Sequence, residues 1–343
     1  MTKTPYLVDW AITENCNLTC RHCRGMVAGD LRRDRAMRLV EEIAALKPGW
    51  VIIEGGEPLL RTDLFDLLTA LRNKDLDVHL ISNGLLLTDT VLSRLRELDV
   101  KVMISIDGAT TATYEAIRAG SSFKKAVAAT RRCAEAGLLS AINCTVLKMN
   151  YREIPGVFDL AASVGAPKIN FIGLKPCHNY PAELLTAEEC GEAIRLACAA
   201  AKRTGLQFFF DEPFFGAVVK EWGLPLPAAS GDAGIVASAT NACIFGEYLF
   251  IEPSGDVKPC SFAPIVVGNV KEKSLIGIWD EMQTSPFFRQ VKESEQRTGH
   301  CRDCQYLAQC KGCRSRTRVI TGDWFASDPV CPLLKKNSKV KEC

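Results

Sequence analysis

Short apolar runs alternate with longer amphipathic segments along the first two-thirds of the chain. The apolar runs predict strands at residues 7–13, 50–54, 78–82, 101–106, 140–147, 168–173 and 207–211. The amphipathic segments predict helices at residues 35–46, 64–72, 90–98, 123–136, 154–163 and 187–203. Continuous apolar strands separated by helices are typical of a parallel sheet covered by helices. Six or seven such units predict an α/β barrel or partial barrel, whose chemistry gathers at the C-terminal strand ends.

The strand–helix alternation stops near Asp211. Prolines and glycines between Pro213 and Gly231 predict a loop or bridging region. After Asn241 the chain consists of short apolar pieces, turns and cysteines, which indicates a second domain. We therefore expect an α/β domain over 1–212, a bridge over 213–240 and a cysteine-rich domain over 241–343. The polar tail after Leu334 is expected to be a solvated end.

Composition narrows the class of protein. With 343 residues and 47% hydrophobic residues, the chain can bury a large core. A net charge of +2 gives no bulk electrostatic reason to expect nucleic acid or an anionic membrane as a partner. We see no signal peptide and no membrane-spanning window, so we expect a cytoplasmic protein. In that reducing compartment, 16 cysteines favour metal or cluster ligands over disulfides.

Three cysteines directly follow the first predicted strand. Cys16, Cys20 and Cys23 have the spacing C-x3-C-x2-C, which lets one loop turn three thiolates onto one cluster. Three thiolates leave one iron of a 4Fe–4S cluster without a protein ligand, and an open position is what a catalytic metal centre needs. The alternative is a zinc loop completed by His22, although this spacing is unusual for zinc.

This cysteine loop, after the first strand of a strand–helix repeat, resembles the signature of the radical SAM superfamily. The resemblance implies a partial (β/α)6 barrel in which S-adenosylmethionine chelates the open iron. It also implies that one electron cleaves a sulfur–carbon bond and yields a 5′-deoxyadenosyl radical, which abstracts hydrogen from the substrate. A reducing partner such as flavodoxin or ferredoxin would supply the electron. The cofactors then carry the difficult step, and the protein orients them.

A glycine-rich motif follows the second predicted strand. Gly55, Gly56, Glu57 and Pro58 form the string Gly-Gly-Glu-Pro. The resemblance implies that this motif contacts the amino group of S-adenosylmethionine. Glycines allow a close backbone approach, and the carboxylate of Glu57 can accept hydrogen bonds from an ammonium group.

Polar residues end the next two predicted strands. Ser82 and Asn83 end the third strand, and Ser105 and Asp107 end the fourth. By resemblance these residues surround the ribose and the methionine carboxylate of S-adenosylmethionine. Arg118 resembles an arginine that pairs with that carboxylate, and its alternative is an exposed helical arginine.

Other residues are candidates for contacts with the cofactor or substrate. His22 lies where the family often places an aromatic residue beside the adenine, and its alternative is a solvent-held loop histidine. Asp211 and Glu212 follow the last strand and are candidates for a proton acceptor or substrate anchor, against a solvated bend. Cys177 follows the sixth strand and could face substrate or ligate a cluster. The remaining scattered cysteines are expected to pack: Cys133, Cys144, Cys190 and Cys198.

A second set of cysteines lies beyond residue 240. Its members are Cys243, Cys260, Cys301, Cys304, Cys310, Cys313 and Cys331, with Gly255 ahead of Cys260. This series resembles the seven-cysteine SPASM extension, which binds two auxiliary clusters, and so brings the expected total to three 4Fe–4S clusters. The spacing departs from the usual pattern at one place, because only Lys311 and Gly312 separate Cys310 from Cys313. The alternative is a zinc ribbon.

The resemblance also divides these cysteines. It implies that Cys301, Cys304, Cys310 and Cys331 hold the second auxiliary cluster, and that Cys243, Cys260 and Cys313 hold the first. The first cluster then lacks a fourth thiolate. Its open iron could accept a substrate group, or Cys177, Cys343 or a carboxylate could close it. We expect the first cluster to be the functional one and the second to be structural or to relay electrons.

The last portion of the chain, from Cys310 to Cys331, resembles a subgroup containing haem d1 and alternative-haem synthesis enzymes and mycofactocin-type maturases. That resemblance implies oxidative modification, such as decarboxylation or cross-linking, of a tetrapyrrole side chain or a ribosomal peptide. Few residues precede Cys16, which favours a small molecule or a peptide delivered by a partner. The alternatives are a maturase of another protein or metal cofactor, or an iron–sulfur electron carrier without S-adenosylmethionine chemistry.

Overall fold

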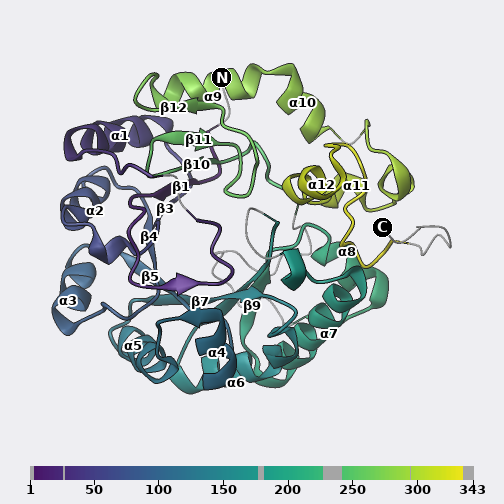
Figure 1. Cartoon of the computed structure of the whole chain (residues 1–343), viewed down its shortest axis with the longest axis horizontal. Coiled ribbons are helices and arrows are strands. Elements are labelled where there is room, and N and C mark those ends of the chain that lie inside the picture. The colour runs from purple at the N-terminus through teal and green to yellow at the C-terminus, as the bar shows by residue number, and fades with distance from the viewer. Residues whose placement is uncertain (1–3, 26–27, 177–180, 227–241, 294, 335–343) are drawn as a thin grey trace.

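The architecture is a curved, mostly parallel sheet. The computed structural model describes residues 4–25, 28–176, 181–226, 242–293 and 295–334. Figure 1 shows the sheet curving into an incomplete ring with helices on its outside. In sheet order the strands are β12 (Gly268–Asn269), β11 (Asp256–Lys258), β10 (Leu249–Ile251), β1 (Val8–Ala11), β3 (Val51–Glu54), β4 (Val78–Ser82), β5 (Lys101–Ser105), β7 (Leu139–Val146), β8 (Lys168–Gly173) and β9 (Gln207–Phe210).

The six-unit barrel core is confirmed. Strands β1, β3, β4, β5, β7 and β8 pair in parallel in chain order, and β9 adds a seventh strand. The covering helices are α1 (Arg33–Leu46), α2 (Leu64–Arg72), α3 (Asp89–Glu97), α4 (Thr111–Ile117), α5 (Phe123–Glu135), α6 (Ile154–Val164) and α7 (Ala187–Thr204). Single 3-10 turns occur at Pro58–Leu60, Tyr151–Glu153 and Pro181–Glu183. In the described ranges, no helix has the length and apolar character needed to cross a bilayer.

Strand alternation explains how the sheet separates its two faces. Val8 and Trp10 of β1 point into the main core shared with the helices. Ala11 has the opposite parity and packs with Tyr248 and Phe250 in a second apolar cluster. Because successive side chains of a strand alternate in direction, this second cluster lies on the sheet face away from the outer helices.

One segment expected as a loop is helical instead. Helix α8 (Phe215–Trp222) occupies part of the predicted bridge, and that expectation was wrong there. The helix follows Pro213 and ends at Gly223, whose φ of 60° forms a left-handed C-cap. Gly216 lies buried inside the helix, so it does not mark a turn.

The cysteine-rich segment continues the barrel's own sheet. Strand β10 pairs in parallel with β1 on the side opposite β3, and β11 and β12 follow as antiparallel strands. The remaining elements are α9 (Leu275–Thr284), α10 (Pro286–Lys292), the 3-10 helix η4 (Gly299–Asp303), α11 (Leu307–Cys310) and α12 (Arg314–Thr321). Figure 1 shows α11 and α12 beside α8, at the end of the chain.

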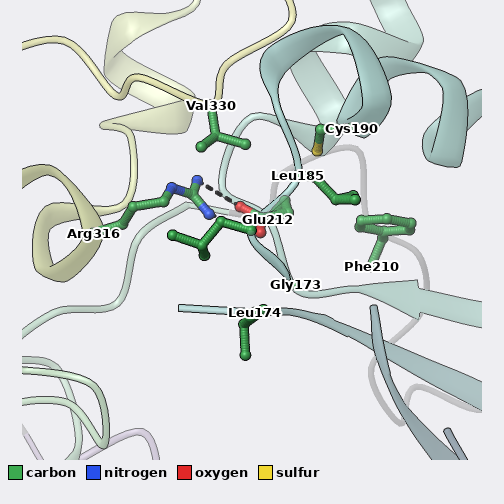
Figure 2. Close-up of a pocket in the computed structure, with 9 residues that line it drawn as sticks. Gly173, Leu174, Leu185, Cys190, Phe210, Glu212, Arg316 and Val330 are labelled. Carbon is green, nitrogen blue, oxygen red and sulfur yellow. Dashed lines mark hydrogen bonds and ion pairs between the residues drawn. The ribbon is translucent and has the colours of Figure 1, made fainter. Parts of the chain in front are cut away.

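A buried ion network joins this segment to the barrel. Arg316 of α12 donates to both oxygens of Glu212, at 2.9 and 2.7 Å, and to both oxygens of Asp328, at 2.9 and 2.7 Å. Figure 2 shows the guanidinium reaching Glu212 across the junction. Lys175, which follows β8, also donates to Glu212 at 3.2 Å. A cavity of about 10 Å³ beside the pair has room for about one water.

This network predicts a large difference between two arginine substitutions. Arg316→Met leaves two buried carboxylates without their main partner and should lower the free energy of unfolding by about 3–5 kcal/mol. Arg203→Met removes an ion pair with Asp159 whose side chains are 54% and 56% exposed, so it should leave the free energy of unfolding nearly unchanged. Urea denaturation of the anaerobically purified proteins at equal iron content measures both. Equal losses would contradict the role given to Arg316.

Candidate functional site

The first three cysteines lie in a loop that is fixed to the barrel at several points. Cys16, Cys20 and Cys23 are free thiols between β1 and α1. Strand β2 (Thr19–Cys20) pairs with β6 (Arg118–Ala119), and Cys20 lies opposite Arg118. This pairing holds the middle of the loop against the segment that follows α4.

The glycines of the Gly-Gly-Glu-Pro motif make room for this loop. The amide of Gly56 donates to the carbonyl of Thr13 and that of Glu57 to Asn15, both at 2.8 Å. A Cβ on Gly55, where φ is 147°, would lie 2.6 Å from the Thr13 oxygen, and one on Gly56 would clash with Asn15. The glycines therefore let the end of β3 bond directly to the backbone that leads into the cysteines.

The Glu57 carboxylate has an internal role. It is fully buried and accepts from the Ser82 hydroxyl at 2.9 Å, the Asn83 amide at 2.8 Å and the Leu59 amide at 3.2 Å. Burial raises the pKa of Glu57, and the hydrogen bonds from Asn83 and Ser82 oppose that rise. This carboxylate ties the ends of β3 and β4 together, and its expected contact with an ammonium group stays a prediction. Asn83 extends the link by donating to Asn17 of the cysteine loop at 2.7 Å.

Asp107 brings three predicted residues together. Its carboxylate lies 2.7 Å from Nε of Arg118 and 3.3 Å from Nε2 of His22, and it accepts from the Thr145 amide at 2.7 Å. Nη1 of Arg118 approaches Sγ of Cys20 at 3.8 Å. Arg118 is thus buried, which excludes the exposed helical alternative. Asp107 therefore holds the positively charged guanidinium of Arg118 beside Cys20, a predicted cluster ligand.

Burial and the charge of Arg118 both affect the pKa values of the ionisable groups in this loop. Burial raises the pKa of the Cys20 thiol to about 11, and the guanidinium of Arg118 opposes the rise. Burial lowers the pKa of His22, although Asp107 acts in the other direction. Nδ1 of His22 is buried and has no hydrogen-bond partner among the described residues. A polar atom left unpartnered beside the thiols fits a site that takes up a further group.

For two predicted residues, Ser105 and Pro58, the structure gives a position near a strand end but no link to the cysteine loop among the described residues. Ser105 ends β5, where it is partly buried and lies in register with Asn143 of β7. Pro58 is buried at the first position of the 3-10 turn Pro58–Leu60. Both lie at the C-terminal edge of the sheet, where the cysteine loop also lies.

The first auxiliary cysteines adjoin the inner face of the barrel. Cys260 packs against the apolar cluster that contains Tyr248 and Phe250. The amide of Cys313, at the start of α12, donates to Asp328 at 2.8 Å. Burial raises the pKa of Cys313, and Arg316 and Lys175 oppose the rise. The buried ion network therefore both positions this thiol and favours its ionised form.

The second auxiliary cysteines lie in tight turns of the C-terminal segment. The Cys304 amide donates to the Cys301 carbonyl at 3.3 Å, and the Cys331 amide donates to the Asp328 carbonyl at 3.1 Å. Between Cys310 and Cys313, Lys311 and Gly312 both have a φ of 62°. Two consecutive left-handed residues turn the chain sharply, which explains how the shorter spacing is accommodated.

Asp211 and Glu212 have different roles. Glu212 is bound by Arg316 and Lys175 and is buried, so its expected roles as proton acceptor or substrate anchor are corrected. The Asp211 side chain is 41% exposed and lies 3.6 Å from Lys175. Cys177 lies outside the described residues.

Sequence reasoning did not single out Lys175, which is buried, or Arg24, which is partly buried. Lys175 donates to the carbonyls of Gly173 and Asp211 as well as to Glu212. Arg24, next to Cys23, pairs with Glu54 of β3 and covers the ring of Phe250 at 4.4 Å. The sequence signal that could have identified them is position: Lys175 lies just beyond the end of β8, and Arg24 directly follows Cys23. The scattered cysteines are buried as expected, on helices or a strand: Cys133, Cys190, Cys198 and Cys144.

Comparisons with known proteins decide the family. Residues 10–161 match the model of the radical SAM superfamily, and residues 243–305 match SPASM, an iron–sulfur cluster-binding domain. An AdoMet-dependent heme synthase of Methanosarcina barkeri is 30% identical over 96% of this chain and 97% of its own length. The chain belongs to the radical SAM superfamily. It is an enzyme of that superfamily with a SPASM domain.

Other relatives and solved structures agree with this fold. The mycofactocin maturase MftC of Mycobacterium tuberculosis is 29% identical over 95% of this chain and 83% of its own length. Streptococcus suis SuiB bound to its precursor peptide SuiA superimposes with a TM-score of 0.76, at 16% identity, over 96% of this chain and 76% of that one. A structure of anSMEcpe with bound AdoMet gives a TM-score of 0.71 at 19% identity, covering 95% and 90% of the two chains.

Membership of the radical SAM superfamily gives the cofactors as S-adenosylmethionine and a 4Fe–4S cluster, and the SPASM domain adds auxiliary iron–sulfur clusters. The residues fit this assignment. Three free thiols in one loop form a soft donor set suited to iron, and the unpartnered Nδ1 of His22 lies in the same loop. In the described part of the chain, no three His, Cys, Asp or Glu side chains lie close enough to hold a single metal ion.

Loss of any one loop thiol should separate the two kinds of cluster. Cys16→Ala, Cys20→Ala or Cys23→Ala should abolish reductive cleavage of S-adenosylmethionine and leave the auxiliary iron in place, because the two cysteine sets lie on different elements. Detection of 5′-deoxyadenosine together with iron analysis measures both results. Cys133→Ala, at a buried helical thiol, is the control and should retain cleavage. Cleavage that survives any of the three loop changes would disprove the ligand assignment.

Proposed function

We propose that this radical SAM enzyme oxidatively decarboxylates a propionate-type side chain of a tetrapyrrole. The observation that carries the proposal is the nearly end-to-end match to three AdoMet-dependent heme synthases. They are 28–30% identical over 95–96% of this chain and 86–97% of their own lengths. The mycofactocin maturases, at similar identity, match over 82–88% of their lengths.

The proposed reaction begins with the loss of one hydrogen atom from the substrate. When bound, S-adenosylmethionine and its cluster would provide the radical that removes this atom. When that hydrogen leaves the carbon next to the tetrapyrrole ring, the carboxylate leaves as carbon dioxide and a carbon–carbon double bond forms. One electron remains and requires an acceptor close to the substrate. The product is a vinyl group in place of the propionate.

The side chains near the cysteine loop orient the cofactor. Asp107 holds the ring of His22 through Nε2 and leaves Nδ1 free to contact the adenine. Arg118, fixed by Asp107 beside Cys20, is the charge available to the methionine carboxylate. A preorganised arrangement of this kind lowers the reorganisation needed when the ligand binds.

Asp211 follows β9, at the same C-terminal end of the strands as the cysteine loop. Its carboxylate is accessible and contacts the substrate. Its neighbour Lys175 is fully engaged by Gly173, Asp211 and Glu212, so its role is to hold the strand ends. Its exposed position next to Lys175 leaves the Asp211 carboxylate free to meet a polar group of the substrate, which suits an anchor.

The first auxiliary thiols are the functional set. Cys260 adjoins the inner apolar cluster and Cys313 interacts with Lys175 at the strand ends, which supports placing this set on the substrate side. A cluster without a full thiolate set carries less negative charge, which favours electron acceptance. Two rival fourth ligands, Cys177 and Cys343, lie outside the described residues.

A second candidate function is modification of a ribosomal peptide. It is favoured by relatives named mycofactocin maturase and PqqA peptide cyclase, the latter 28% identical over 96% of this chain. In either case the electron for each turnover comes from a flavodoxin- or ferredoxin-like protein. A cytoplasmic location would suit the 16 cysteines of the chain as cluster ligands, because that compartment is reducing.

The substrate class can be tested directly. The reconstituted protein, given S-adenosylmethionine and a reductant, should convert an iron porphyrin bearing propionates into a product with a vinyl group and release carbon dioxide. Mass spectrometry of the porphyrin measures the change, and a porphyrin without propionates is the control. Formation of 5′-deoxyadenosine with no change in any porphyrin, together with modification of a precursor peptide, would favour the second candidate.

The role of the first auxiliary set gives another prediction. Cys243→Ala or Cys313→Ala should abolish formation of the vinyl product while 5′-deoxyadenosine is still formed, because the residual electron loses its acceptor. Cys198→Ala, at a buried thiol of α7, should retain both activities. Product formation by the Cys243 and Cys313 variants at the normal rate would refute the assignment.

A further inference from the structure

Two arginines are buried in the cysteine-rich C-terminal segment without a direct ion pair to a carboxylate among the described residues. Arg297 and Arg314 are each 1% exposed, and neither forms an ion pair with a carboxylate within the described ranges. By contrast, Arg316, two residues beyond Arg314, binds both Glu212 and Asp328. A buried guanidinium normally requires a paired anion, because removing its charge from water is costly.

Backbone carbonyls satisfy only part of each side chain. Nη2 of Arg297 donates to the carbonyl of Val291 at 2.6 Å, while Nε and Nη1 are buried with no described partner. Arg314 donates to the carbonyls of Trp324 and Ala326 at 2.7 and 3.1 Å, and its Nη2 has no described partner. Three buried nitrogen donors are therefore held in place without a described acceptor. This indicates that an anionic group accepts their hydrogen bonds.

The positions of both arginines indicate which acceptor this is. Arg314 directly follows Cys313, and the hydroxyl of Ser327 joins the residue after Arg297 to Cys301: it donates to the Thr298 carbonyl at 3.0 Å and accepts from the Cys301 amide at 2.9 Å. Burial and the positive charge of Arg314 lower the pKa of Arg297 to about 10, and the thiols of Cys243, Cys301 and Cys310 act in the opposite direction. Cys243 belongs to the first auxiliary set, and the other two belong to the second. The Cys243 amide also donates to the Cys310 carbonyl at 3.2 Å, so the two sets meet here.

We propose that Arg297 and Arg314 are positioning residues that supply the shared counter-charge of the two auxiliary clusters, through their three unpartnered donors. Thiolate-ligated clusters are anionic, and net charge and hydrogen bonds to sulfur set their reduction potentials. The arginines raise both potentials. This inference rests on the assignment of the cysteines as ligands and not on the identity of the substrate.

The geometry of Gly312 supports the role of Arg314. Gly312 lies in the turn between Cys310 and Cys313, and a Cβ at this position would clash with Nη2 of Arg314. Its amide donates to Sγ of Cys310 at 3.3 Å. The short, left-handed turn thus brings one terminal nitrogen of Arg314 close to the backbone that carries ligands of both sets.

The test uses the full-length protein with all three loop cysteines changed to alanine, so that only the auxiliary clusters give signals. Arg297→Gln and Arg297→Lys are introduced and reconstituted anaerobically, and iron content and EPR-monitored redox titrations are recorded. Arg35→Gln is the control, because Arg35 is a little-exposed arginine that pairs with Glu42, on helix α1.

We expect Arg297→Gln to shift the auxiliary midpoint potentials to lower values, Arg297→Lys to restore part of the shift, and Arg35→Gln to leave them unchanged. Loss of auxiliary iron in the glutamine variant but not in the lysine variant would equally support the need for the charge. Unchanged potentials with full iron content would overturn the proposal. So would loss of iron in both variants, which would assign Arg297 a packing role alone. A parent protein without auxiliary iron would overturn the cysteine assignment itself.

Discussion

The guanidinium of Arg316, enclosed between Glu212 of the barrel and Asp328 of the C-terminal segment, controls where the auxiliary site lies relative to the strand ends. Its planar fork binds both carboxylates bidentately, which fixes orientation as well as distance. Burying these charges brings a desolvation cost that the pairing must offset, so the gain is in geometry more than in stability. Because Asp328 also accepts the amide of Cys313, the same network aligns the first auxiliary thiol with the barrel.

Several residues of the family motifs stabilise the site from within. The carboxylate of Glu57 links two strand ends, and Asp107 links Arg118, His22 and the end of β7. The glycines of the motif permit backbone contact with the segment before Cys16. These residues make the cysteine loop part of the sheet edge, which keeps three thiols in place before any cofactor binds.

Local patterns predicted much of the fold, since strands β4 and β8 and helix α2 begin and end where the apolar periodicity placed them. The parallel pairing of β10 with β1 could not be predicted, because a three-residue apolar run carries no information about a partner some 240 residues away. Helix α8 was hidden by its proline and glycine signals. Lys175 and Glu212 required tertiary structure, because ordinary charged residues at strand ends look alike until their partners are known.

We propose that substrate lies between the cysteine loop and the first auxiliary thiols, where hydrogen is taken from the propionate carbon next to the ring. The most direct measurement uses an iron porphyrin deuterated at that carbon and follows deuterium by mass spectrometry. We expect one deuterium in 5′-deoxyadenosine for each vinyl group formed. Unlabelled 5′-deoxyadenosine alongside the vinyl product would contradict this proposal.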